Sequence, residues 1–245
     1  IRDLPAALDG FSIAQVSDVH VGATIKRGYV QRIADEVDAL GADMVAITGD
    51  LVDGSVGQLA DDVAPLARLR SRHGTFFVTD GYEETRVIKF DKDGNFLMAW
   101  GERGEMGKET RPGYFNTVHG IAIDNQRRIY VNDRGNRRIQ VFDENGKFLS
   151  QWNLGDGPTA TYHIWMSADQ HLWMSDGHGN FKFYKYDLNG RLLYSWGTMM
   201  PEAGGLWGTH QFGVDQDNNL YTAEVWGGRP QKFVPRASAD PALLV

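Results

Sequence analysis

The chain of 245 residues contains no cysteine, which excludes disulfides, thiolate metal sites and cysteine nucleophiles. It also lacks an excess of basic residues, because its formal net charge is −7, whereas a nucleic-acid-binding surface is basic. No apolar run approaches the roughly 18 residues that indicate a membrane-spanning helix. The sequence therefore predicts a soluble protein with no nucleic-acid partner and no membrane span, and leaves open whether it is cytoplasmic or exported.

Aromatic residues are scarce in the first third of the chain. Residues 1–78 hold 4 of the 28 aromatic residues and none of the 7 tryptophans. The periodicity of apolar residues changes at the same place, from strand–helix alternation to a repeat of short strands. The sequence therefore predicts two parts, residues 1–78 and residues 79–245.

Short apolar runs alternate with helical patterns in the first part. Residues 11–20 and 43–54 are predicted as buried strands, and apolar spacing predicts helices over 27–41 and 56–74. Residues 75–79 would form a third strand. Because strands that alternate with helices form parallel sheets, the predicted fold of this part is a small α/β parallel-sheet segment. Ligands of such sheets bind at the carboxyl ends of the strands.

Acidic and histidine residues follow the first two predicted strands at this edge. Asp18 and His20 end the first strand, and Asp50 and Asp53 follow the second. Carboxylate and imidazole ligands together suit Mn, Fe or Zn. A carboxylate that bridges two cations supports phosphoryl chemistry. The alternative is that Asp and His at strand ends are ordinary loop residues.

The segments "SDVHVG" and "TGDLVDG", with a strand–helix–strand pattern between them, resemble the calcineurin-like metallophosphoesterases over residues 10–79. The resemblance implies that Asp18, His20 and Asp50 bind a divalent metal. The family pattern continues with G-N-H-E after the third strand and with a later G-H-x-H. This chain has "DGYE" at the first place and no G-H-x-H, so the implied two-metal site is half built.

Four segments of the second part align with one another. Their acidic positions are Asp80, Asp133, Asp176 and Glu224, at separations of 53, 43 and 48 residues. Each segment alternates apolar and polar residues and three contain a turn such as "DENGK", which predicts a hairpin. These turns imitate the start of a calcium-binding loop but lack its later Glu, so plain hairpins are predicted. Four strands in about 45 residues are typical of a β-propeller blade.

The phrases "HGIAID", "YVNDRGNRRIQVFD" and "GKFLSQW" resemble NHL-repeat β-propellers, close to the peptidyl-hydroxyglycine lyase-like group, over residues 79–236. The segment "FFVT" fits both the third phosphoesterase strand and the second strand of a blade. We therefore expect a chimera that changes family within one shared strand. Trp100, Trp152 and Trp196 recur at the end of the fourth strand of a blade, where they are expected to pack between blades.

The expected blades are incomplete at both ends of the repeat. The first blade lacks its inner strand and the last lacks its outer strand, which leaves 3, 4, 4 and 3 strands in about three to four blades. A partial propeller exposes sheet edges and apolar blade faces. A homo-oligomer, with a homodimer as its simplest form, is therefore expected to complete the ring.

Three histidines each open the strand that should be innermost in its blade. They are His119, His163 and His210, with His163 one residue out of phase. The resemblance to the amidating lyases, whose channel histidines hold zinc, implies a metal site with an open coordination position. The alternative is that each histidine simply caps a strand.

Two arginines beside the loop after "YVND" are the candidate substrate-binding residues. Arg134 and Arg137 would bind an anion near the channel, although solvated surface charge is the alternative. Tyr162, Trp207 and Trp226 are candidates to line a pocket beside the histidines.

Three classes of function follow from these patterns. The leading prediction is a metal-dependent hydrolase that acts on small-molecule phosphoester-type substrates through a metal-activated water. The alternatives are an amidating-lyase-like propeller and a non-catalytic NHL module that binds a partner.

Overall fold

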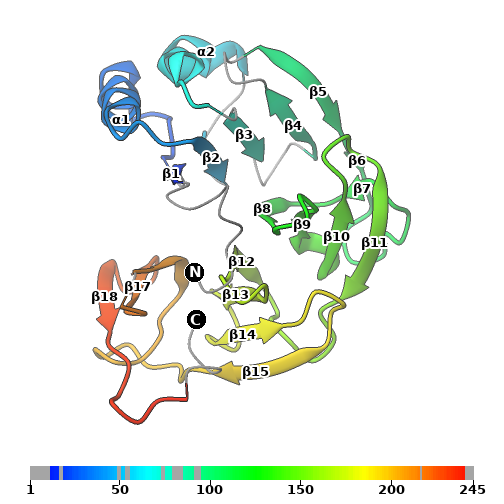
Figure 1. Cartoon of the computed structure of the whole chain (residues 1–245), viewed down its shortest axis with the longest axis vertical. Coiled ribbons are helices and arrows are strands. Elements are labelled where there is room, and N and C mark those ends of the chain that lie inside the picture. Colours follow the sequence, from blue (N-terminus) through cyan, green and yellow to red (C-terminus); the bar gives the residue numbers. More distant parts are fainter. Residues whose placement is uncertain are drawn as a thin grey trace. The chain divides into compact units, whose positions relative to one another are not determined.

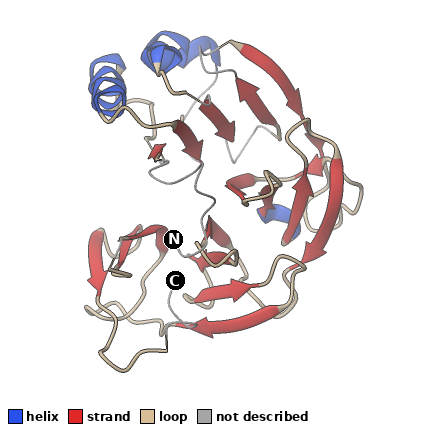
Figure 2. Ribbon diagram, in the orientation of Figure 1, coloured by secondary structure: helices blue, strands red, loops and turns tan. Residues whose placement is uncertain are grey.

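The structure, a computed structural model, describes residues 12–16, 19–48, 51–52, 56–72, 75–78, 85–90, 95–215 and 217–240. The chain divides into two compact units, Ile1–His119 and Gly120–Val245. Both α-helices of the described residues lie in the first unit, and the described residues of the second unit form strands, loops and one short 3-10 helix (Figure 2). No helix in this described part is long and apolar enough to cross a membrane.

The first unit contains a five-stranded sheet in the order β1-β2-β3-β4-β5 (Figure 1). Its elements are β1 (Ile13–Val16), α1 (Arg27–Ala39), β2 (Met44–Thr48), α2 (Val56–Val63), the 3-10 helix η2 (Ala64–Arg68), β3 (Thr75–Val78), β4 (Val87–Phe90) and β5 (Phe96–Trp100). Pro65 lies in the first turn of η2, so the helical segment changes type where proline removes a backbone donor.

Strand β3 joins two kinds of sheet. It pairs in parallel with β2, where Phe76 lies opposite Ala46, and antiparallel with β4, where Phe77 lies opposite Ile88. β1 also runs parallel to β2, whereas β4 and β5 are antiparallel. The strand that both resemblances include is therefore paired on both of its edges. The change of pattern at residues 78–79 falls inside this sheet, and the domain boundary placed there stays a prediction.

Helix α1 covers the parallel part of the sheet with one apolar face. Val30, Ala34 and Val37 are buried at helical spacing, because residues three and four apart lie on the same side of a helix. They belong to one core cluster with residues of β1 and β2, namely Ala14, Val16, Val45 and Ile47. The amide of Arg27 donates to the Asp62 carboxylate at 3.0 Å, which ties the start of α1 to α2.

The connection after β5 contains a short parallel pair of strands, β6 (Glu102–Arg103) and β7 (Tyr114–Phe115). Between them the Arg111 guanidinium donates to both carboxylate oxygens of Glu109, at 2.9 and 2.7 Å. Side-chain and backbone hydrogen bonds from Arg111 lower the pKa of Glu109 to about 2. The Arg111 guanidinium also lies over the Tyr114 ring, 3.7 Å from its centroid.

Two four-stranded antiparallel sheets and one three-stranded antiparallel sheet follow. Their strands are β8 (Val118–Ile123), β9 (Ile129–Asp133), β10 (Arg138–Phe142), β11 (Phe148–Asn153), β12 (Thr161–Met166), β13 (Leu172–Asp176), β14 (Phe183–Tyr186), β15 (Leu192–Trp196), β16 (Thr209–Val214), β17 (Leu220–Glu224) and β18 (Arg229–Phe233). In the second unit β11 and β15 lie on the outer side of their sheets (Figure 1). The fold is propeller-like, and no sheet closes on itself within the described residues. The predicted blades of four antiparallel strands are confirmed, and completion of the ring by a second copy stays a prediction.

Two of the three predicted hairpin turns between the last two strands of a blade are confirmed, and the first, "DKDGN" at 91–95, lies largely outside the described residues. The Asp143 carboxylate accepts hydrogen bonds from the amides of Asn145 and Lys147, both at 2.9 Å. Asp187 makes the same two contacts in the equivalent turn of the next sheet. The carboxylate oxygens therefore close the turns, as Asp side chains do in Asx-turns.

Two of the recurring tryptophans pack between neighbouring sheets of the second unit, as predicted. Trp152, on β11, lies 5.2 Å from the ring of Tyr186 on β14. Its indole also lies against Gly190, where an added Cβ would come within 2.5 Å of the ring. Trp196, on β15, contacts Phe233 of β18 at 5.9 Å. These rings fill the space between successive blades.

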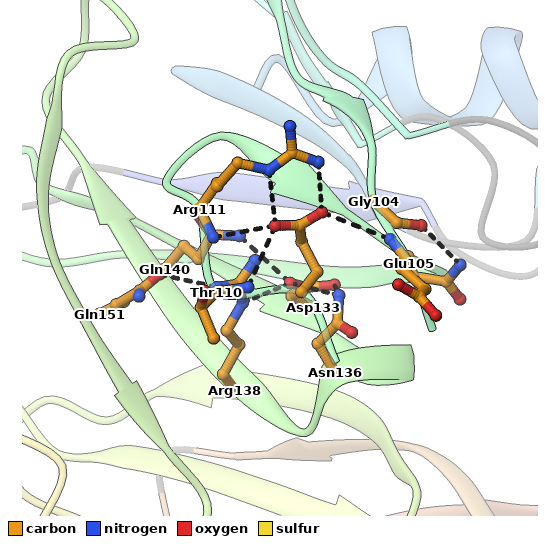
Figure 3. A network of polar contacts seen from close by, with 11 residues as sticks. Gly104, Glu105, Thr110, Arg111, Asp133, Asn136, Arg138, Gln140 and Gln151 are labelled. Carbon is orange, nitrogen blue, oxygen red and sulfur yellow. Dashed lines mark hydrogen bonds and ion pairs between the residues drawn. The ribbon is translucent and has the colours of Figure 1, made fainter. Parts of the chain in front are cut away.

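A buried ion pair lies at the end of β9. The Arg138 guanidinium donates to the Asp133 carboxylate at 2.6 Å, and their side chains are 2% and 0% exposed (Figure 3). Gln140 donates to the same carboxylate at 3.1 Å, and so does Asn136. A charge this deeply buried is tolerated only when it is paired and hydrogen-bonded.

Replacing Arg138 with Met should therefore destabilise the second unit strongly, because the Asp133 carboxylate would remain buried without its cation. We expect the free energy of unfolding in urea to fall by about 3–5 kcal/mol. Arg127→Met is the matched control, since Arg127 is 75% exposed in its pair with Glu144 and should cost less than about 1 kcal/mol. Equal losses in the two variants would contradict this account of the buried pair.

Candidate functional site

Three loops at equivalent places in successive blades carry the candidate site of the second unit. Each follows a buried carboxylate that ends the second strand of its sheet: Asp133 on β9, Asp176 on β13 and Glu224 on β17. The first loop begins with Arg134, the second contains His178 and the third contains Trp226. The three equivalent loops thus carry chemically different side chains: a guanidinium, an imidazole and an indole.

The carboxylate of Asp176 organises its loop without a basic partner among the described residues. It accepts hydrogen bonds from the amides of Thr159 and Ala160 at 3.1 and 3.2 Å, and from those of His178 and Asn180 at 3.2 and 3.1 Å. The Thr159 hydroxyl adds a further bond at 3.2 Å. Asp176 therefore ties the start of β12 to the loop after β13.

Glu224 organises the next loop with a basic partner. Its carboxylate accepts from the Arg229 guanidinium at 2.9 Å, from the Gln231 amide group at 2.7 Å and from the Trp207 backbone amide at 3.1 Å. The Trp207 ring stacks on Phe181 at 5.3 Å, which places it within the packing between the last two sheets. The loop with Trp226 is therefore held at both of its ends.

The central group of the site, here called the Arg134 cluster, consists of Arg134, Tyr162 and His210. The Arg134 guanidinium lies over the Tyr162 ring, with its central carbon 4.3 Å from the ring centroid. The Tyr162 and His210 rings lie 4.7 Å apart. The Nη1 atom of Arg134 is buried and has no hydrogen-bond partner among the described residues. The cluster therefore holds a buried, positively charged hydrogen-bond donor over an aromatic ring.

A bulge in each inner strand explains which side chains meet. The pairing of β12 with β13 shifts between Thr161 and His163, and that of β16 with β17 shifts between Thr209 and Gln211. Tyr162 and His210 are the extra residues at these two shifts. Tyr162, and not His163, therefore takes the place equivalent to His210. This replacement corresponds to the one-residue offset of His163 in the aligned sequence repeat.

His163 has different surroundings from His210. Its ring is 1% exposed and meets the ring of Phe212 edge-on at 5.0 Å. His119, on β8, is also 1% exposed and ends the first compact unit, whereas the other two histidines lie in the second. Among the described residues, no group of three His, Asp or Glu side chains is arranged to hold a metal ion. A metal site of His119, His163 and His210 stays a prediction.

The predicted phosphoesterase ligands lie largely outside the described residues. Asp18, Asp50 and Asp53 are not described, and of this group the structure places only His20, an exposed residue with φ of 51° after β1. The residues "DGYE" at 80–83, which replace the family's next metal motif, also lie outside the described part. The metal role of Asp18, His20 and Asp50 stays a prediction.

Arg137, the second predicted substrate-binding residue, contacts the protein itself. Its guanidinium donates to the carbonyl oxygens of Gly155 at 3.0 Å and Pro158 at 3.4 Å. These contacts attach the loop after β9 to the connection between β11 and β12. Of the two predicted arginines, Arg134 is the one whose buried nitrogen has no protein partner among the described residues.

The geometry of the second unit agrees with comparisons to known proteins. A family described as a 6-bladed beta-propeller matches residues 62–189, just over half of the chain. The chain belongs to this family. NHL repeat-containing protein 3 of Mus musculus is 40% identical over 185 residues, which cover 67% of this chain and 47% of that protein. Peptidyl-glycine alpha-amidating monooxygenase B of Xenopus laevis is 41% identical over 171 residues, which cover 66% and 19%.

The N-terminal portion matches a different group of proteins. An uncharacterized metallophosphoesterase of Helicobacter pylori is 38% identical over 87 residues, which cover 34% of this chain and 24% of that protein. The chain spans less than half of the length of each of these three relatives. The two sets of matches confirm the chimera: a metallophosphoesterase-like portion is followed by an NHL-type propeller portion.

The position of Tyr162 depends on Gly177, and this dependence can be tested. A Cβ added at Gly177 would lie 1.9 Å from Cδ2 of the Tyr162 ring and 2.7 Å from its Cγ, so the rigid ring must move. We expect Gly177→Ala to lower the free energy of unfolding by about 1–3 kcal/mol and to change the near-UV circular dichroism.

Gly213→Ala is the matched control, because nothing lies within 4 Å of a Cβ at that position on β16. Its near-UV spectrum should stay that of the parent protein. If Gly177→Ala were as stable as Gly213→Ala, with an unchanged spectrum, the contact between Tyr162 and Gly177 would be wrong.

Proposed function

We propose that the propeller portion is a ligand-binding module that takes a small anion, a carboxylate or a phosphate, at the Arg134 cluster. The observation that carries this proposal is the buried Nη1 of Arg134, which has no hydrogen-bond partner among the described residues. Of the three classes of function that the sequence leaves open, binding by an NHL-type module is the one that this cluster supports directly.

The physical basis is the cost of an unsatisfied charged donor. Arginine stays protonated in proteins, so burial of its nitrogen without an acceptor is unfavourable by about 1–3 kcal/mol or more. An anion would remove this cost, because the flat guanidinium matches the two oxygens of a carboxylate or phosphate. The Tyr162 ring under Arg134 holds the guanidinium in one orientation, and cation–π contacts of this kind contribute about 0.5–2 kcal/mol.

Arg134→Met should weaken the binding of inorganic phosphate and acetate. One lost charge-assisted hydrogen bond is worth about 1.5–3 kcal/mol, so we expect the dissociation constant to rise roughly tenfold or more. Isothermal titration calorimetry at low ionic strength measures it. Arg191→Met is the matched control, because Arg191 is 76% exposed and pairs with Asp187 in a hairpin turn. Equal affinities of Arg134→Met, Arg191→Met and the parent protein would refute the proposed site.

Metal-dependent hydrolysis of phosphoester-type substrates is a second candidate. Two observations favour it. One is the pair of motifs with Asp18, His20 and Asp50, and the other is the match of the N-terminal portion to a transmembrane protein with metallophosphoesterase domain of Danio rerio and to the Helicobacter pylori metallophosphoesterase. A bound Zn, Mn or Fe ion would supply Lewis acidity toward a phosphoryl oxygen. The amidating-lyase-like alternative is supported by the match to the Xenopus laevis monooxygenase and would use a metal held by His119, His163 and His210.

Chelation tests the second candidate on the intact chain with phosphate mono- and diesters. We expect a chelator to abolish hydrolysis and Zn or Mn to restore it. Asp18→Ala and Asp50→Ala should each remove most of the rate, whereas His119→Ala and His210→Ala should change it little, because the motifs and matches that favour hydrolysis lie in the N-terminal portion. The opposite pattern would move the site to the histidines of the propeller portion. Rates unchanged in all four variants and after chelation would refute metal-dependent hydrolysis and leave the binding module.

A further inference from the structure

Trp226 is a large aromatic side chain that is exposed and yet held in one position. Its residue is 53% exposed, in the loop between β17 and β18. The indole Nε1 donates to the carbonyl oxygen of Gly177 at 3.1 Å, in the neighbouring blade. The ring lies against Gly208, where an added Cβ would come within 1.6 Å of its Cδ1. Backbone on both sides therefore fixes the ring.

The His178 ring lies beside Trp226, at 5.9 Å and an angle of 39°. These two residues are called the aromatic shelf below. The shelf adjoins the Arg134 cluster through Gly177, because the Tyr162 ring lies against that residue and Trp226 binds its carbonyl oxygen. Tyr162 in turn carries the Arg134 guanidinium. The exposed aromatic surface and the positively charged donor are thus linked through Gly177 and the Tyr162 ring.

The negative charges nearest in the sequence do not compete for this donor. Asp133, directly before Arg134, is 0% exposed and is paired with Arg138. Asp176, directly before Gly177, is 1% exposed and uses its oxygens on amides of its own loop and of the start of β12. A ligand that approaches the shelf therefore meets aromatic rings and a guanidinium.

A fixed, exposed tryptophan is suited to stacking. The ring is already held in one orientation, so the binding of a flat ligand ring there costs the protein little conformational entropy. Aromatic pairs prefer offset or tilted stacking at centroid distances of about 4.5–7 Å. A ligand with a flat ring beside its charged group would contact both the aromatic shelf and the Arg134 cluster.

We propose that the ligand of the module is an aromatic anion, an aryl carboxylate or an aryl phosphate, with its ring stacked on Trp226. This proposal rests on anion binding at Arg134 and adds the class of ligand. Trp226 is then the residue that determines specificity, whereas Arg134 supplies affinity for any small anion.

Calorimetric titrations with two matched pairs of ligands test the proposal on the intact chain: acetate against benzoate, and inorganic phosphate against phenyl phosphate. We expect the aromatic member of at least one pair to bind roughly tenfold more tightly, as one stacking contact would produce. The pair with the larger ratio identifies the charged group. Trp226→Leu should reduce that ratio to about one and leave acetate and inorganic phosphate binding unchanged.

Tyr221→Leu is the matched control, because Tyr221 is an exposed aromatic residue of β17, at 42%, whose hydroxyl binds Asp215. It should keep the parent ratio. If Trp226→Leu does not fold, Trp226→Phe, which keeps a ring but loses the indole donor, should give an intermediate ratio.

The two proposals fail in different ways. Equal affinities within both ligand pairs would overturn the aromatic-anion proposal. So would a preference for the aromatic ligand that remains in Trp226→Leu, or one that is undiminished in Trp226→Phe. Anion binding that still depends on Arg134 would then leave the proposed function standing. No binding of any of the four ligands would overturn both.

Discussion

A buried carboxylate at the end of the second strand is the interaction on which the rest of the propeller portion depends. A carboxylate without solvent must be surrounded by donors. In three successive sheets these donors come from the loop that follows, from the next strand and, for Asp176 and Glu224, from the segment before the first strand of the sheet. The loop therefore has one shape before any ligand arrives. Asp133, Asp176 and Glu224 fix the loops that carry Arg134, His178 and Trp226, so structural and functional residues are neighbours in sequence.

The three carboxylates are satisfied by different means. Asp133 and Glu224 each bind an arginine, whereas the donors to Asp176 among the described residues are backbone amides and a hydroxyl. Because the repeat conserves the position of the acid and not its partner, each loop is free to carry another side chain. The scaffold is thus common to the blades, and the chemistry of the site arises from their differences.

Much of the fold could be predicted from the sequence because it rests on local patterns. The strand numbers of the last three sheets, the Asp143 and Asp187 turns and the packing of Trp152 and Trp196 all follow from alternation and spacing within one repeat. The site can be predicted only in part, with Arg134, Tyr162 and Trp226 as the candidate residues that the sequence offers. The bulge that brings Tyr162 to His210 leaves no mark in the amino-acid composition, so the sequence does not reveal it. The contacts of the Tyr162 and Trp226 rings with Gly177 join separate blades, which local sequence patterns do not describe.

Strand β3 shows what kind of junction a chimera tolerates. Its parallel partner belongs to the metallophosphoesterase-like portion and its antiparallel partner to the first blade, yet both ladders use backbone amides and carbonyls. Backbone groups are the same in every residue except proline. A single strand can therefore pair on one edge with strands of one family and on the other edge with strands of another. Recombination within such a strand needs neither a linker nor a new interface, so sheet edges are natural crossover points between unrelated folds.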